Sequence, residues 1–216
     1  MIELYDRYSQ ESRDLHESLV ATGLSQLGVV IDADGFLPDG LVSPFTYYLG
    51  YEKGKPLYFN QVPVPAFWEI SGNNQSARIE DMTQERALIH YADGMQARLV
   101  KQVDWKDLEG RVRQVDHYNR FGACFATTTF SADSEPVMTV YQDVNGQEVL
   151  LENHVTGDIL LTLPSQSMRY FANKVEFITF FLQDLEIDTS QLIFNTLATP
   201  FLVSFHHPDK SGSDVL

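Results

Sequence analysis

The sequence predicts an α+β fold in which an antiparallel β-meander is inserted into a βαβ-type frame. Apolar residues recur at helical spacing near both ends of the chain, and each helical segment precedes a short apolar run. Between these ends, β-branched and aromatic runs alternate with regularly spaced turn signals. A frame that is interrupted by a meander accounts for this order. We therefore expect a first frame segment at 1–50, an inserted sheet domain at 51–165 and a return of the frame at 166–216.

The first frame segment opens with a helix that is predicted over about residues 6–22, with Gly23 placed to end it. The residues that fall near one face of this helix are Tyr8, Leu15, Leu19 and Thr22. The following run, Gly28–Ile31, is too apolar for a half-exposed strand. We expect this strand to lie inside a sheet that is covered on both sides.

The inserted sheet is predicted from the spacing of turns. The chain from Phe45 to Ile70 is aromatic and is interrupted by prolines, which suits extended edge segments. From Leu88 to Leu163, five turn signals punctuate the chain, and their glycines at 110, 122, 146 and 157 are 12, 24 and 11 residues apart. An interval of about 12 residues holds one strand and a tight turn. Polar residues fall on both sides of these strands, so at least one face should meet solvent or a partner.

The frame returns with a helix that is predicted to start after Asn173, which forms a capping box with Glu176. The apolar side of this helix comprises Val175, Ile178, Phe181, Leu182 and Leu185. Two short strands, at 192–194 and 201–205, are predicted on either side of a break at Thr199-Pro200. Residues 211–216 have the composition of a linker, so we expect the chain to be part of a longer protein.

The composition disfavours several functions. The chain has 30 acidic and 15 basic residues, a formal net charge of −15, and its lysines and arginines do not cluster, so we expect no nucleic-acid partner. Cys124 is the single cysteine, which excludes an intrachain disulfide and favours a reducing compartment. The N-terminus does not resemble a secretory signal, and no run of about 18 apolar residues occurs, so we expect no integral membrane segment.

The strongest catalytic signal is Asp32-Ala33-Asp34-Gly35, directly after the first apolar strand. Paired carboxylates at the carboxyl end of a strand could hold Mg²⁺, as in haloacid-dehalogenase-type phosphatases or in some sugar-nucleotide transferases. A phosphatase also needs a downstream lysine and a later acidic pair, and the regions of Lys174 and Lys210 do not supply that context. An Asp-Gly turn that leaves the strand is the simpler interpretation.

A histidine-based metal site is also weakly supported. His206 and His207, with Asp209 beyond them, supply too few ligands, because the other histidines are scattered. The chain contains no Gly-rich phosphate loop, nucleophile elbow or His-Glu-x-x-His helix. We therefore expect no catalytic residue, no metal and no cofactor.

Aromatic residues on an incompletely buried sheet are typical anchors for a binding partner. The segment 57–65 could pair with the edge of another chain, although its prolines could equally block such pairing. The residues that we predict to contact a partner or an acceptor polypeptide are Tyr58, Phe59, Trp68, Trp105, Tyr118 and Phe121.

Several long, aromatic-rich motifs together resemble one family, the glycosylation-stabilising chaperone subunits of accessory Sec systems. The resemblance extends along all 216 residues. The segments that carry it are Asp32–Pro38, Lys55–Pro65, Phe67–Gly72, Val103–Trp105, Asp116–Asn119, Glu152–Ile159 and Thr199–Phe201.

The resemblance implies a fold and a role. Members of that family are similar to double-Rossmann glycosyltransferases with an antiparallel sheet inserted into the first half, so the frame here would be an incomplete Rossmann-like half, and the second half would be absent after Leu216. Such subunits are taken to be inactive themselves. Each joins a catalytic O-linked N-acetylglucosamine transferase subunit and holds a serine-rich-repeat adhesin acceptor before export. The implied location is the cytoplasm, at the inner face of the cell membrane.

Two other hypotheses remain open from the residues. The first is a magnesium-dependent phosphatase or sugar-nucleotide enzyme that uses Asp32 and Asp34. The second is a scaffold that self-associates through its sheet edges.

Overall fold

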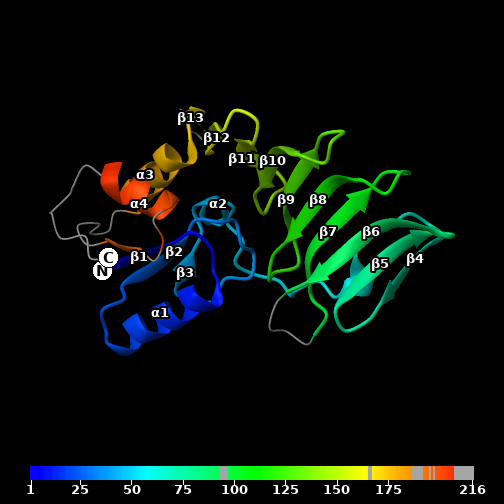
Figure 1. The fold of residues 1–216 in the computed structure, drawn as a ribbon, viewed down its shortest axis with the longest axis horizontal. Helices are drawn as coiled ribbons and strands as arrows, with labels where there is room; N and C mark the ends of the chain where they lie inside the picture. The colour runs from blue at the N-terminus through cyan, green and yellow to red at the C-terminus, as the bar shows by residue number, and fades with distance from the viewer. Residues whose placement is uncertain (93–96, 165–166, 186–191, 195, 197, 207–216) are drawn as a thin grey trace. The chain divides into compact units, whose positions relative to one another are not determined.

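The computed structural model describes residues 1–92, 97–164, 167–185, 192–194, 196 and 198–206 (Figure 1). The chain divides into two compact units. We call Met1–Tyr48, Gly157–Leu160 and Met168–Leu216 the frame unit, and we call Leu49–Thr156 with Leu161–Ser167 the sheet unit. The structure contains a four-stranded parallel sheet and a ten-stranded sheet, and this confirms the predicted α+β class.

The parallel sheet of the frame unit has the strand order β14-β1-β2-β3. Its strands are β1 (Ile2–Tyr5), β2 (Leu27–Val30), β3 (Leu41–Val42) and β14 (Leu192–Phe194). Three residues of β2 are buried, as predicted for this apolar run. The central strand β1 is fully buried but was not predicted, because Glu3 interrupts its apolar pattern.

The helices of the frame unit are α1 (Gln10–Ala21), α2 (Pro44–Tyr47), α3 (Lys174–Asp184) and α4 (Thr199–His206). Helix α1 starts four residues later than predicted, because the Ser9 side chain accepts a hydrogen bond from the Ser12 amide and caps the helix. Tyr8 and Leu15 pack against the buried Tyr5, as their predicted apolar face requires. Thr22, in contrast, is exposed.

Helix α3 confirms its predicted start after Asn173 and three residues of its predicted apolar side, Ile178, Phe181 and Leu182, whereas Val175 and Leu185 are only half-buried. The Asn173 carboxamide oxygen accepts a hydrogen bond from the Glu176 amide at 3.0 Å, which satisfies a donor of the first turn. The residues of α3 that are buried are Phe177, Ile178, Phe181 and Leu182. Among the described residues, no helix is long and apolar enough to cross a membrane.

The predicted strand at 201–205 is wrong, because Thr199–His206 forms helix α4. We interpreted Thr199-Pro200 as a break between two strands. Proline is also well tolerated in the first turn of a helix, where its missing N–H group has no intrahelical partner to lose. The apolar run after Pro200 therefore continues as a helix, which packs against α3.

The ten-stranded sheet has the order β13-β12-β11-β10-β9-β8-β7-β6-β5-β4, so each strand pairs with its neighbours in sequence. The strands are β4 (Trp68–Gly72), β5 (Ser76–Asp81), β6 (Gln84–Tyr91), β7 (Val100–Lys106), β8 (Val112–Tyr118), β9 (Cys124–Phe130), β10 (Pro136–Gln142), β11 (Glu148–Asn153), β12 (Ile159–Leu161) and β13 (Arg169–Phe171). The predicted antiparallel meander is therefore present, and the five turn signals lie at junctions between consecutive strands, although Pro136 of one signal is already the first residue of β10.

The meander begins earlier than predicted. Its first two strands, β4 and β5, precede Leu88 and contain charged residues that obscure their β pattern. The aromatic segment that precedes them was predicted as extended edges. It instead contains helix α2 at its start and a short 3₁₀ turn, η1 (Phe59–Gln61). Pro44 occupies the first turn of α2, where it favours a helix.

Candidate functional site

The antiparallel sheet has two faces with different chemistry. Direct cross-strand pairs place Ile79, Ala87, Trp105 and Gln114 in one row. We call the sheet side that contains this row the aromatic face. The opposite side contains the paired residues Leu88, Asp104, Val115, Thr128, Thr139 and Glu152, and we call it the polar face. Both faces therefore carry polar residues, as the sequence pattern indicates.

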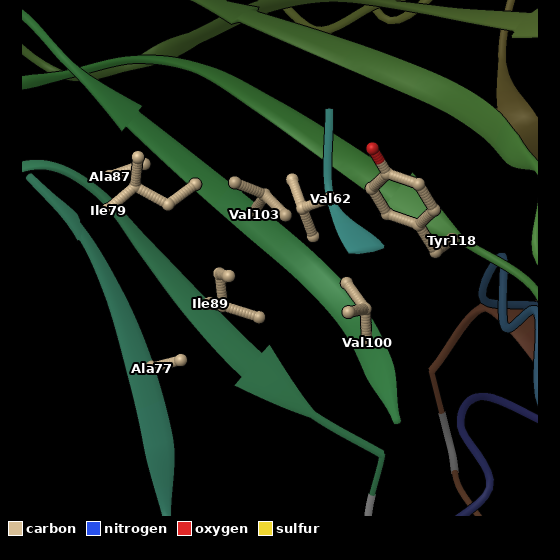
Figure 2. Close-up of a cluster of buried hydrophobic side chains, with 8 residues drawn as sticks. All are labelled: Val62, Ala77, Ile79, Ala87, Ile89, Val100, Val103 and Tyr118. Atoms are coloured by element: carbon tan, nitrogen blue, oxygen red, sulfur yellow. The ribbon is translucent and has the colours of Figure 1, made fainter. Parts of the chain in front are cut away.

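The aromatic face is built on a buried cluster in the sheet unit. Figure 2 shows Val62, from the segment before β4, beside Val103 and Tyr118 of the sheet. The other members of the cluster are Ala77, Ile79, Ala87, Ile89 and Val100. Leu57 and Phe59 pack against the same cluster, so the segment before β4 covers part of this face. The cover leaves the sheet end that carries Trp68 and Trp105 partly open, because both indoles are only half-buried.

The structure brings four of the six predicted contact residues together. Phe59, Trp68 and Trp105 pack against the buried cluster, and Tyr118 is a member of it with 7% exposure. The Tyr58 ring lies against the Phe59 ring, with ring centroids 4.8 Å apart and the planes tilted by 57°, and Tyr58 is exposed. Tyr58 is thus the most accessible of these five aromatic residues.

The sixth predicted residue, Phe121, lies in the turn between β8 and β9 and is half-buried. The Arg120 guanidinium stands over its ring, 5.2 Å from the centroid. The buried Asn119 side chain organises this turn, since its oxygen accepts hydrogen bonds from the amides of Phe121 and Ala123. Phe121 therefore belongs to a rigid turn and is not part of the buried cluster.

Polar side chains that were not predicted surround Trp105. The indole N–H donates a hydrogen bond of 2.7 Å to Asp116, which also accepts hydrogen bonds from Gln114 and Thr127. The alternation of Gln114 and Asp116 along β8 was visible in the sequence, but their common contact with Trp105 required the strand register. This group offers hydrogen-bonding side chains next to an aromatic surface.

Arg86 is a second group that was not predicted. Its guanidinium stands 5.2 Å from the centroid of the Trp68 ring, which is a favourable cation–π geometry. Its Nε atom is buried and has no hydrogen-bond partner among the described residues. A buried donor without an acceptor costs free energy, so this donor is a candidate for bonding to a ligand.

A hydrogen-bond chain crosses three strands of the polar face. The His117 Nε2 atom contacts the Thr128 hydroxyl at 2.9 Å, Thr128 contacts Thr139 at 2.8 Å, and Thr139 contacts His154 at 2.7 Å. Thr128 and Thr139 are buried, so their hydroxyls satisfy each other. This part of the face holds the strands together and offers few free polar groups to a partner.

We expect stability to depend on pH through two histidines of this face. Burial lowers the pKa of His117 below its ordinary 6.5, so its contribution is present above about pH 6.5 and is lost as the pH falls through the folded-state pKa. The hydrogen bond to Asp104 raises the pKa of His90, so its contribution is present below about pH 6.5 and is lost as the pH rises.

Urea unfolding at about pH 7.5 and about pH 5 distinguishes the contributions of the two histidines to stability. His117→Gln should reduce the loss of stability on acidification, and His90→Gln should increase it. An unchanged pH dependence in His117→Gln would show that this ring is not the titrating group.

The carboxylates of the enzyme hypothesis lie directly after β2 in the frame unit. Asp34 accepts a hydrogen bond of 2.8 Å from the Phe36 amide, which is the local geometry of a turn. No group of three or more potential metal-binding side chains occurs in the part of the chain that the structure describes. Of the weakly supported histidine site, His207 and Asp209 lie outside the described residues, as does the side chain of His206.

Comparison with known proteins adds three consecutive domain matches. The sequence model described as the GtfB N-terminal domain matches residues 2–48, the GtfB middle domain matches 68–172, and the GtfB third domain matches 174–216. Together the three matches span nearly the whole chain, and they follow one another as N-terminal, middle and third domain of one family.

Curated relatives agree with these domain matches. A protein of Streptococcus pneumoniae serotype 4 (strain ATCC BAA-334 / TIGR4) that is named UDP-N-acetylglucosamine--peptide N-acetylglucosaminyltransferase stabilizing protein GtfB is 93% identical over 216 residues, which are 100% of this chain and 48% of that protein. The protein of the same name from Streptococcus gordonii is 51% identical over 218 residues, again with 100% and 48% coverage. The chain thus spans about half the length of these relatives.

A solved structure shows the same fold. It is described as the crystal structure of a GtfA/B complex bound to UDP and GlcNAc, and one of its chains matches 95% of this chain over 46% of its own length. The TM-score is 0.91 and the sequence identity is 53%. The family domains, the identities and the shared fold agree, and this chain belongs to the GtfB family.

Proposed function

We propose that this chain is part of a non-catalytic stabilising subunit that binds a catalytic O-GlcNAc transferase subunit and a serine-rich-repeat adhesin acceptor. In this role it enables O-glycosylation of serine and threonine before accessory Sec export. The observation that carries the proposal is the 93% identity, over the whole chain, to a protein that is named a stabilizing protein of such a transferase. We further propose a cytoplasmic location, peripheral at the inner face of the membrane, and domain boundaries at 1–50, 51–165 and 166–216.

The aromatic face suits an extended acceptor polypeptide. Such a chain presents hydroxyl groups and backbone amides, which need hydrogen-bonding groups beside an apolar surface. The Gln114 side chain and the Arg86 Nε atom, which has no hydrogen-bond partner among the described residues, supply such groups next to the half-buried Trp68 and Trp105. We therefore assign acceptor contact to this face, with Tyr58 as its exposed aromatic anchor.

A binding experiment tests this assignment. The Tyr58→Ala variant should bind a synthetic serine-rich acceptor peptide about tenfold more weakly, because loss of an aromatic anchor costs more than 1 kcal/mol. Isothermal titration calorimetry measures the affinity. Tyr47→Ala in the frame unit is the matched control, since Tyr47 is an exposed tyrosine outside the aromatic face. Equal binding by both variants would contradict the role of the aromatic face.

The enzyme hypothesis makes a different prediction, which concerns catalytic turnover and not acceptor binding. It requires Asp32 and Asp34 to carry out turnover with Mg²⁺. If replacement of both residues with Asn leaves glycosylation by the complex unchanged, the enzyme hypothesis is eliminated. The turn hydrogen bond of Asp34 supports the structural role.

A further inference from the structure

Three large apolar side chains lie at one end of the sheet. Trp68 of β4 pairs with Asp81 of β5, so Phe67, just before β4, and Met82, just after β5, are the next residues outward. The third is Leu108, in the β7–β8 turn, whose carbonyl accepts a hydrogen bond of 2.7 Å from the Gln84 side chain at the start of β6. Figure 1 shows the β5–β6 and β7–β8 turns at the same end of the sheet. We call Phe67, Met82 and Leu108 the apolar rim.

The apolar rim is unusually exposed. The exposed fractions are 96% for Phe67, 93% for Met82 and 72% for Leu108. A single exposed apolar residue needs no explanation, but neighbouring ones on a folded protein mark an interaction site. These side chains belong to turns and are largely exposed, so they would act as anchors that enter recesses in a partner.

Two residues of the rim also carry backbone strain. The φ angles of Phe67 and Met82 are 71° and 56°, in the left-handed region that bulky residues rarely adopt. Met82 is the first residue of a two-residue hairpin turn, where glycine, asparagine or aspartate is usual. Glycine at either position would relieve the strain and remove an exposed apolar side chain. Fold stability alone therefore does not account for Phe67 and Met82.

The exposed side chains of the rim and the net charge of the chain limit the kinds of partner that this surface could bind. Extended peptides bind in grooves or along strand edges, whereas protruding anchors require a folded surface with recesses. A second copy of this chain is disfavoured, because each copy has a net charge of −15. Two ion pairs lie near the rim, Lys106–Glu85 and Arg111–Asp107. The rim thus has an apolar centre and a charged border, which is the composition of a protein interface.

We propose that the apolar rim is the docking surface for the catalytic transferase subunit, which receives Phe67, Met82 and Leu108 in apolar recesses. This inference rests on the proposed function, which supplies the partner. It separates two surfaces of the sheet unit: the rim holds the catalytic subunit, and the aromatic face contacts the acceptor.

The test combines three substitutions with a matched control. The variant Phe67→Ser/Met82→Ser/Leu108→Ser should bind the purified catalytic subunit about a hundredfold more weakly in calorimetry, since each truncated anchor costs about fivefold. Val144→Ser, which changes a residue with 59% exposure in the β10–β11 turn, should bind like the wild-type chain. The triple variant should keep its affinity for the acceptor peptide.

A second variant excludes misfolding as the cause. Phe67→Gly/Met82→Gly should lose affinity for the catalytic subunit without any fall in the unfolding temperature, because glycine relieves both left-handed positions. Wild-type affinity in the triple variant would overturn the inference. So would a loss of self-association in light scattering, which would identify a second copy as the occupant. If the wild-type chain itself does not bind the catalytic subunit, the proposed function fails first.

Discussion

Replacing His16 with alanine is expected to lower the free energy of unfolding of the frame unit by about 3 kcal/mol. Glu3 lies on the central strand β1 and is fully buried. Its Oε2 atom contacts His16 Nδ1 at 2.5 Å and accepts a hydrogen bond of 2.8 Å from the Tyr5 hydroxyl. Its Oε1 atom has no hydrogen-bond partner among the described residues. Without His16, the carboxyl group would be left buried with one donor, which is strongly destabilising.

Urea unfolding followed by circular dichroism measures this loss, and hydrogen exchange at the β1 amides assigns it to the frame unit. Glu17→Ala is the control, because Glu17 is an exposed neighbour on the same helix. The double variant Glu3→Leu/His16→Leu should recover much of the lost stability, since apolar residues can replace a buried pair. If His16→Ala lowers the free energy of unfolding by less than about 1 kcal/mol, the Glu3–His16 pair does not stabilise the packing of α1 on β1.

The same pair shows why the sequence predicted only part of the frame. The apolar run of β2 was sufficient to predict a buried strand, because its burial depends on its own residues. β1 was missed, because Glu3 looks like a surface residue until α1 brings His16 against it. Helix α4 was mistaken for a strand, because eight residues with mainly apolar side chains fit either period.

The meander was predictable because its turns are specified by residues that lie close together in the sequence. In the Asp143-Val144-Asn145-Gly146 turn, the glycine has a φ of 76°. The aspartate side chain accepts hydrogen bonds from the backbone amides of Asn145 and Gln147. Such preferences are visible in a short window of sequence. The Trp105–Asp116 contact depends on register between strands, and Phe67 and Met82 reveal their strain only through backbone angles. Neither signal exists in composition or periodicity.

Replacing Gly122 with alanine is expected to destabilise the sheet unit by about 3 kcal/mol, from left-handed strain and from overpacking together. Gly122 has a φ of 85°, and an added Cβ would stand 2.3 Å from the Lys55 carbonyl oxygen. Gly54 belongs to the same contact between residues 54–55 and 121–122, since its added Cβ would stand 2.1 Å from the Phe121 carbonyl oxygen. The two backbones thus approach so closely that neither position admits a side chain.

This contact positions the segment that carries Tyr58 and Phe59 over the aromatic face, so Gly122→Ala should weaken acceptor binding as well as stability. Gly110→Ala is the matched control, because Gly110 has a φ of 79° in the preceding hairpin turn but no atom within 4 Å of an added Cβ. It should cost only the left-handed strain, about 1 kcal/mol, and leave binding unchanged. Urea unfolding and calorimetry measure both effects. If the two variants lose equal stability, the contact between residues 54 and 122 does not hold the segment, and acceptor binding must depend on the sheet residues alone.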